Sequence, residues 1–133
     1  MSLVSGMYHF STDSVRWEEA SDRGSMKGGS LVEIDSATEN EAIIQYLKAR
    51  PELGNTFWIG LSDLSKEGEM RWQKSGNLVQ DGYENWIPGQ PDDYGGGEED
   101  CVEFCAHYST HPEDDWAWND HGCFREKLPI CEK

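Results

Sequence analysis

The sequence predicts an α+β domain in which short helices and strands support one long loop. Apolar residues at helical spacing occur only before residue 50, whereas the later apolar runs have the length of strands. Residues 62–100 are mostly irregular and rich in Gly, Pro, Asn and Asp. Ordering such a segment costs about 1–2 kcal/mol of chain entropy per residue, and loops of this length are usually functional. We therefore expect bound ions to stabilise it.

Length and charge limit the function further. The 133 residues predict a single domain, 1–133, with one hydrophobic core to which six Trp, five Tyr and four Phe contribute. The formal net charge of −15 argues against nucleic acid or anionic membranes as partners. An excess of this size also repels itself, and two bound Ca²⁺ ions would cancel four of these charges where the acids cluster.

The first third of the chain predicts a strand, a helix and a second strand. Trp17, Ala20 and Met26 lie at helical spacing and would form an inward stripe, and a Gly pair then ends the helix. The expected elements are a strand at 4–10, a turn and helix cap at 11–14, a helix at 15–26 and a short alternating strand at 31–34.

A capping box at residues 36–39 begins the clearest helix of the sequence. Its inward face is expected to comprise Ala42, Ile43, Tyr46 and Leu47, and a Pro and a Gly follow it. Further strands are expected at 57–61, where the run is apolar on both faces, around 70–72, and at 101–105, 115–118 and 124–131, which close the fold.

Segment 86–101 contains five carboxylates and no Lys or Arg. The five are Asp92, Asp93, Glu98, Glu99 and Asp100. Hard oxygen ligands, a Gly run and the absence of thiol or imidazole inside the loop favour Ca²⁺ over a transition metal. The alternative is a solvated acidic loop. The polar clusters W-N-D at 118–120 and S-D-x-x-x-E at 62–67 favour the calcium interpretation, because they offer further oxygen ligands.

Four Cys lie in the last third of the chain, at 101, 105, 123 and 131. No C-x-x-C pair is present, and an even count in an acidic domain of this size indicates disulfides and an oxidising compartment. We expect a secreted protein whose signal peptide is not in this chain, with a membrane anchor in the native chain left open. No apolar run is long enough to span a bilayer.

Five motifs together resemble the C-type lectin carbohydrate-recognition domain, in its order and at its spacings. They are W-I-G-L at 58–61, Q-P-D at 90–92, G-E-E-D-C at 97–101, W-N-D at 118–120 and P-I-C-E at 129–132. The resemblance extends from about Tyr8 to Glu132. It implies the family's double-loop fold, with two helices, short antiparallel strands and a long loop that binds Ca²⁺, and a sugar that coordinates the ion directly.

The resemblance implies two calcium sites. The principal site would consist of Gln90, Asp92, Glu99, Asn119 and Asp120, with Asp120 also offering its backbone carbonyl. Glu99 occupies the family position, two residues before Cys101, and Glu98 is the additional acid. The second site would consist of Asp63, Glu67, Asp93 and Asp100, with Glu99 bridging.

The same resemblance implies a galactose-type sugar, because Q-P-D goes with the axial 4-hydroxyl of galactose and N-acetylgalactosamine. Tyr94 stands where galactose-type members place a ring that stacks on the sugar. Sugar contacts are therefore expected from Gln90, Asp92, Tyr94, Glu99, Asn119 and Asp120. Glu103 replaces a His that favours N-acetyl groups in some relatives, so the sequence does not choose between the two sugars.

The resemblance also implies a Cys101–Cys123 disulfide. The family's outer bridge lacks its helix cysteine, because Gly24 stands there. Cys105 therefore pairs with Cys131, which we rank first, stays a buried thiol, or links two chains. A dimer or higher oligomer would strengthen the binding of galactose-terminated glycans through multivalency.

Two other classes of function remain. A C-type lectin-like domain that binds a protein ligand would share the fold, but such domains usually lose calcium ligands that this chain keeps. An enzyme is not expected: His107 and His111 do not belong to an H-E-x-x-H motif, and nothing raises the pKa of a carboxyl group in so polar a loop.

Overall fold

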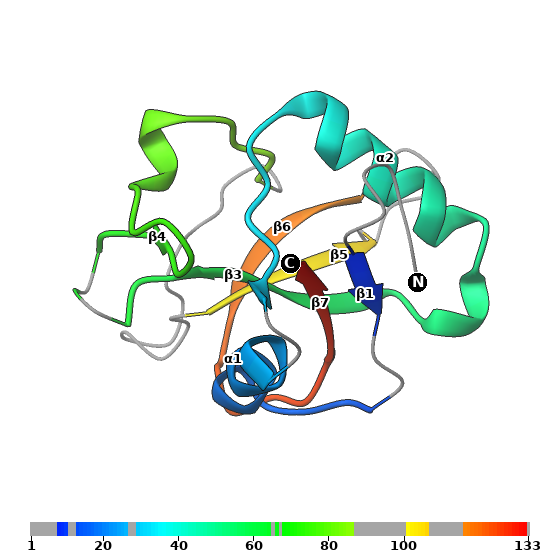
Figure 1. Ribbon diagram of the computed structural model, residues 1–133. Coiled ribbons are helices and arrows are strands. Elements are labelled where there is room, and N and C mark those ends of the chain that lie inside the picture. Colours follow the sequence, from blue (N-terminus) through cyan, green and yellow to red (C-terminus); the bar gives the residue numbers. More distant parts are fainter. Residues whose placement is uncertain are drawn as a thin grey trace.

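The computed structural model describes residues 8–10, 13–26, 29–64, 66, 68–86, 101–106 and 116–132. Within these residues, two α-helices and two 3₁₀ turns surround a twisted sheet (Figure 1). In chain order the elements are β1 (Tyr8–Phe10), α1 (Trp17–Met26), β2 (Ser30–Leu31), α2 (Ala37–Lys48), η1 (Pro51–Leu53), β3 (Thr56–Ser62), β4 (Arg71–Trp72), η2 (Val79–Asp81), β5 (Cys101–Ala106), β6 (Trp116–His121) and β7 (Leu128–Glu132). The expected α+β class is confirmed.

The sheet has the order β1-β7-β3-β5-β6, with β2 paired to β7 and β4 paired to β3. All pairs are antiparallel except β3 with β7. Tyr8 in β1 lies opposite Glu132 in β7, so the two ends of the described chain lie side by side (Figure 1). Strand β6 forms the far edge of the sheet, and the segment before it and the segment before β5 contain residues that the structure does not describe.

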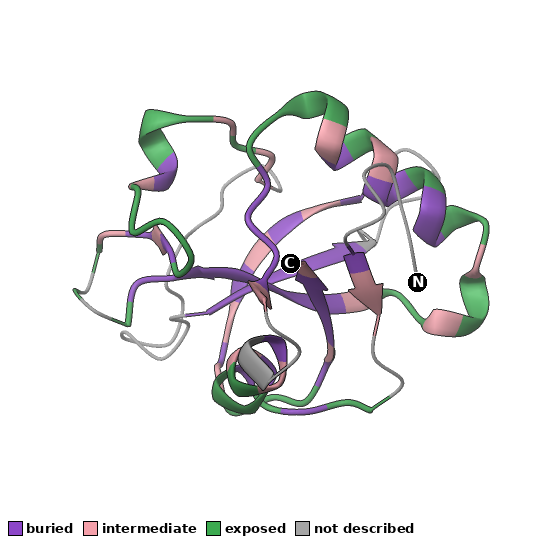
Figure 2. Ribbon diagram, in the orientation of Figure 1, coloured by how far each residue is buried: buried purple, intermediate pink, exposed green. Residues whose placement is uncertain are grey.

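Strand β3 is the centre of the core, as its apolar run predicts. Every residue from Phe57 to Leu61 is buried (Figure 2). Its two faces contact different clusters, one beside α2 and one beside α1. Between the Trp58–Glu103 and Ser62–Cys101 pairs the register with β5 shifts, and there the N–H of Gly60 donates to the carbonyl of Val32 at 2.9 Å. A buried strand covered on both sides explains the continuous hydrophobic run.

Helix α1 begins later than the sequence indicates. Val15 lies in a β-bridge with Lys127, with both backbone hydrogen bonds at 2.9 Å, and the helix starts at Trp17. The long-range pairing overrides the local cap signal. Trp17 and Ala20 are buried as expected. The expected first strand begins at 4, and only its end, Tyr8–Phe10, lies within the described residues.

The expected cap of helix α2 is confirmed, but one of its two hydrogen bonds has a different donor. The Ser36 hydroxyl accepts from the N–H of Glu39 at 3.1 Å, while the Glu39 carboxylate accepts from the N–H of Asp35 at 2.9 Å instead of that of Ser36. The buried face includes Ile44 in place of Ala42, which is only half-buried.

Two expected strands are shorter than their sequence patterns. Residues 31–34 are all buried and do not alternate, and only Leu31 of the four belongs to a strand. The strand expected at 124–131 begins at Leu128, because Arg125 donates to the carbonyl of Gly122 in a turn that leaves Phe124 58% exposed.

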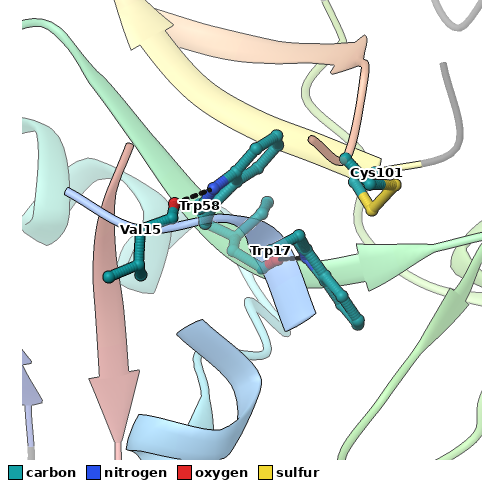
Figure 3. Close-up of a disulfide and its surroundings, with 6 residues drawn as sticks. Val15, Trp17, Trp58 and Cys101 are labelled. Atoms are coloured by element: carbon teal, nitrogen blue, oxygen red, sulfur yellow. Dashed lines mark hydrogen bonds between the residues drawn. A yellow bond between two sulfur atoms is a disulfide. The ribbon is translucent and has the colours of Figure 1, made fainter. Parts of the chain in front are cut away.

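The Cys101–Cys123 disulfide is confirmed, with its Cα atoms 5.1 Å apart. It lies in the cluster beside α1, where the indole N–H of Trp58 donates to the carbonyl of Val15 and that of Trp17 donates to the carbonyl of Ile59, each at 2.9 Å (Figure 3). This bridge ties the first residue of β5 to the turn that precedes β7.

The expected pairing of Cys105 with Cys131 is wrong. Cys105 lies opposite Thr56, whereas Cys131 follows the Trp58–Pro129 pair by two residues on the other side of β3. Four residues of strand separate the two levels, roughly 13 Å, and a disulfide needs Cα atoms within about 7 Å. Cys105 is a buried thiol. The position of the missing helix cysteine, Gly24, packs so closely on β2 that a Cβ there would lie 2.8 Å from the carbonyl carbon of Ser30.

Candidate functional site

The structure describes three of the ten predicted calcium or sugar residues: Asp63 directly after β3, and Asn119 and Asp120 in β6. The other seven lie outside the described residues. They are Glu67, Gln90, Asp92, Asp93, Tyr94, Glu99 and Asp100. Six of these seven lie in segment 87–100. The structure describes the residues on either side of this segment, Trp86 and Cys101.

The first end of segment 87–100 is fixed against β6. Trp86 forms a parallel bridge with Trp118, whose N–H donates to the carbonyl of Asn85 at 2.8 Å. The Asn85 side chain donates to the carbonyl of Trp116 at 3.1 Å, and the indoles of Trp86 and Trp118 meet edge to face at 5.7 Å. The chain therefore enters the segment directly beside the W-N-D residues.

The second end of the segment, Cys101, lies between the strand that precedes Asp63 and the strand that contains Asp120. Cys101 pairs with His121 in β6 and with Ser62 in β3. Asp63 follows Ser62, and Asp120 precedes His121. Segment 87–100 therefore begins close to Asn119–Asp120. It ends close to both Asp63 and Asp120. The sheet register thus places Asp63 and Asn119–Asp120 beside the two ends of this segment.

Asp63 fits a cation ligand. Its side chain is 4% exposed, and its Oδ2 accepts from the N–H of Gly68 at 3.0 Å. Its Oδ1 is buried and accepts no hydrogen bond from any described residue. A buried carboxylate oxygen without a donor is costly, so a bound cation would stabilise it. Among the described residues no three His, Cys, Asp or Glu side chains are grouped so that they could hold a metal ion, so further ligands of Asp63's cation would have to come from other residues.

Asn119 and Asp120 lie on opposite faces of β6, which alternates between buried and half-buried residues. Asp120 is completely buried, on the face of Trp116 and Trp118. Asn119 is half-buried and lies opposite Glu103 of β5.

Glu103 is the centre of a buried polar group that joins four segments. Its carboxylate accepts from the Thr56 hydroxyl at 2.5 Å, from the Asn119 amide Nδ2 at 2.7 Å and from the Lys127 ammonium at 3.0 Å. Burial alone would raise the pKa of Glu103, but the hydrogen bonds from Thr56 and Asn119 and the charge of Lys127 lower the pKa below its ordinary value. Burial lowers the pKa of the neighbouring His121 imidazole below its ordinary value, although the charge of Glu103 opposes this effect.

Sequence reasoning missed Thr56 and Lys127 as neighbours of the site. Lys127 is 7% exposed, although lysine is almost never buried without a partner. No local pattern identifies it, since its partner is 24 residues away in the sequence. Asn40 was missed too: it is buried in α2 and accepts from the indole N–H of Trp118 at 3.2 Å, which orients the first residue of W-N-D.

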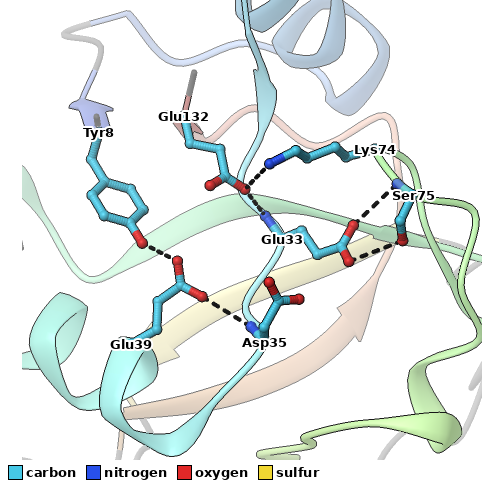
Figure 4. A network of polar contacts seen from close by, with 7 residues as sticks. All are labelled: Tyr8, Glu33, Asp35, Glu39, Lys74, Ser75 and Glu132. Carbon is cyan, nitrogen blue, oxygen red and sulfur yellow. Dashed lines mark hydrogen bonds and ion pairs between the residues drawn. The ribbon is translucent and has the colours of Figure 1, made fainter. Parts of the chain in front are cut away.

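A second group of carboxylates lies apart from this site, around the end of β7 (Figure 4). Glu132 accepts from the N–H of Glu33, Glu33 accepts from the N–H and hydroxyl of Ser75, and Glu39 accepts from the Tyr8 hydroxyl and the N–H of Asp35. A pocket of about 280 Å³ lies beside Glu33. Among the described residues, Glu33, Glu39 and Glu132 have no buried carboxylate oxygen without a hydrogen-bond partner, in contrast to Oδ1 of Asp63.

Comparison with known proteins agrees with the fold. The family model of the lectin C-type domain matches residues 13–133. C-type lectin domain family 10 member A from Homo sapiens is 38% identical over 94% of this chain, and salivary C-type lectin 2 from Aedes albopictus is 32% identical over 95%. The chain spans about a third of the human relative (36%) and most of the mosquito one (82%).

Solved structures show the same fold, and one of them is of a protein described as calcium-independent. The mouse scavenger receptor C-type lectin carbohydrate-recognition domain has a TM-score of 0.77 and 33% identity, covering 95% of this chain and 88% of that one. A calcium-independent type II antifreeze protein has a TM-score of 0.72 and 25% identity, covering 95% and 84%. The helices among the described residues are too short or too polar to cross a bilayer.

Proposed function

This chain belongs to the C-type lectin domain family, a family of binding proteins and not of enzymes, and we propose that it is a calcium-dependent lectin for galactose-type sugars. The observation that supports this most strongly is the position of the two ends of segment 87–100. They lie beside Asn119–Asp120 and beside Asp63, whose buried Oδ1 fits a cation ligand.

Family members are generally calcium-dependent, and the donor chemistry here suits that ion. We assign a principal site to Gln90, Asp92, Glu99, Asn119 and Asp120, and a second site to Asp63, Glu67, Asp93, Glu99 and Asp100. A bound Ca²⁺ ion would supply open coordination positions for two sugar hydroxyls, since it takes six to eight oxygen ligands. The carboxylates of this chain would accept hydrogen bonds from the sugar hydroxyls, and its side-chain amides would donate hydrogen bonds to the hydroxyl oxygens.

The choice of sugar rests on the order of amide and acid in Q-P-D. Gln90 offers the donor and Asp92 the acceptor, and the reverse order would suit a different diol. Tyr94 offers a ring to the apolar face of galactose. The related carbohydrate-recognition domain of the mouse scavenger receptor supports a glycan as the ligand. We infer galactose-terminated glycans as partners and a secreted, oxidised protein, in line with the salivary relative and the Cys101–Cys123 bridge. A homodimer or higher oligomer would raise avidity.

The first test is retention on immobilised galactose in Ca²⁺ and release by EGTA. Asp92→Ala should abolish retention while the circular dichroism spectrum is unchanged. The control is Asp22→Ala, an exposed acid of α1 with the same change of charge, which should be retained like the wild type. Retention of Asp92→Ala would contradict the assigned site.

The sugar choice has its own test. Gln90→Glu combined with Asp92→Asn should shift binding from galactose to mannose, measured by competition with the free monosaccharides. Unchanged galactose preference would contradict the argument from amide and acid order.

The alternative is a domain of this fold that binds a protein ligand. The calcium-independent antifreeze protein favours it to the extent that the fold does not require the ion. Calcium titration separates the two: absence of Ca²⁺ binding, together with flow-through from galactose, mannose and N-acetylglucosamine columns, would favour the alternative.

A further inference from the structure

The environment of Asn119 fixes which of its two amide atoms faces inward. Its Nδ2 donates to Glu103 Oε2 at 2.7 Å, across a directly paired position of β5 and β6. An ionised carboxylate has only acceptors, so it can face the NH₂ group of the amide but not its oxygen. The orientation of the amide thus follows from the charge of Glu103.

The other contacts of Glu103 keep it charged and in place. Lys127 Nζ lies 3.0 Å from Oε1, and the Thr56 hydroxyl donates to the same oxygen at 2.5 Å. The side chains of Glu103 and Lys127 are 9% and 8% exposed. An ammonium and two neutral donors therefore hold this buried carboxylate in the orientation that faces Asn119.

From this geometry we propose that Glu103, held by Lys127 and Thr56, is a positioning residue that turns the Asn119 oxygen outward as a calcium ligand. The inference rests on the proposed function, because it assigns a role within that site. It also implies that one of the two Asn119 N–H groups is already used by Glu103, which leaves one for a sugar hydroxyl.

The decisive test is whether the effect of Glu103→Gln on calcium affinity changes sign when residue 119 is an aspartate. In Glu103→Gln the new side chain can show Asn119 either an oxygen or an NH₂ group, so the Asn119 amide is no longer held in one orientation. Calcium affinity should fall about tenfold, as is typical when a partner of a metal ligand is removed. In the background Asn119→Asp, the carboxylate of Glu103 would repel the new acid, whereas a glutamine in its place would donate to that acid. There Glu103→Gln should raise calcium affinity, measured by calorimetry and by tryptophan fluorescence.

Two controls complete the design. Glu18→Gln removes the same charge from an exposed position of α1 and should leave calcium affinity unchanged within about twofold. Thr56→Val removes one donor to Glu103 without a change of charge and should weaken calcium binding about twofold to fivefold. It replaces Glu103→Gln if that variant does not fold.

A readout without calcium separates this inference from the proposed function. In the ¹⁵N spectrum of the calcium-free protein, one Asn119 side-chain amide proton should be shifted downfield and slow to exchange, and Glu103→Gln should abolish both properties. If calcium and galactose do not bind the wild type but this signature is present, the proposed function fails and the orientation of Asn119 stands. If Glu103→Gln lowers calcium affinity equally in the wild-type and Asn119→Asp backgrounds, the positioning role is refuted.

Discussion

Gly60 lies where the chain after β2 crosses β3, and Gly60→Ala is the sharpest test of the packing that supports the site. A Cβ at Gly60 would lie 2.9 Å from the carbonyl oxygen of Leu31 and 3.0 Å from that of Val32. Carbon–oxygen contacts normally begin at about 3.3 Å. The two backbones would therefore have to separate by about 0.3–0.4 Å in a fully buried region, which would lengthen the 2.9 Å hydrogen bond from Gly60 to Val32.

The expected cost of Gly60→Ala is the overpacking penalty of about 1–3 kcal/mol. The gain of about 0.4–1 kcal/mol from a stiffer unfolded chain offsets part of it. The net loss is about 1–2 kcal/mol, or a fall of roughly 3–8 °C in Tm for a domain of this length. Urea unfolding followed by tryptophan fluorescence, at fixed Ca²⁺ concentration, measures the loss.

Gly82→Ala is the matched control. Gly82 is exposed, its φ is −146°, and nothing lies within 4 Å of a Cβ built there. The same chemical change should therefore leave stability unchanged or raise it by up to about 1 kcal/mol. Equal stability of the two variants would refute the argument that the crossing over β3 is rigid and requires glycine.

Three further outcomes follow from the described contacts. Replacing Cys101 and Cys123 by Ser removes a bridge with a sequence separation of 22, worth about 3 kcal/mol by loop entropy, so calorimetry should show Tm about 10 °C lower; a change below about 2 °C would contradict this. Burial raises the pKa of the Cys105 thiol to about 12, so peptide mass spectrometry should find it unmodified by iodoacetamide at pH 8 until urea unfolds the protein; rapid native labelling would contradict its burial. Burial also raises the pKa of Glu132, despite its hydrogen bond from Glu33 and the charge of Lys74, so the folded state binds the proton more tightly, and stability due to this group is lost as pH rises through that raised pKa. Glu132→Gln should therefore stabilise the protein more at pH 7 than at pH 4 in urea titrations, and an equal effect at both pH values would contradict the shift.

Local signals predicted the parts of the fold that depend on local physics. The apolar run of β3, the Ser36 cap and the amphipathic helix α2 follow from side-chain spacing and from hydrogen bonds between near neighbours. The start of α1 could not be found in this way, because Val15 is removed from the helix by its pairing with Lys127. The late start of β7 has a similar cause, since the turn at Gly122–Arg125 depends on the disulfide and the strands around it.

The residues of the candidate site likewise fall into those that the sequence predicted and those that only the structure revealed. Motif order identified Asp63, Asn119 and Asp120, and the register of β5 with its two neighbours brings the corresponding segments together. The polar group around Glu103 could not be predicted, because Thr56, Lys127 and Asn119 come from three separate segments of the chain. Only the paired sheet shows that Glu103 has a buried lysine beside it.

The sheet explains why such a site can form in a chain with this excess of acids. Strands β3, β5 and β6 hold Asp63, Glu103 and Asn119 from a core of completely buried side chains, so these residues are ordered by packing. Lys127 balances Glu103 on the interior side, so the polar group adds no net charge toward the loop. Residues 92–100 contain five acids and no Lys or Arg of their own. Because packing holds these residues, removal of the proposed Ca²⁺ ions should weaken the proposed sugar binding long before it unfolds the sheet.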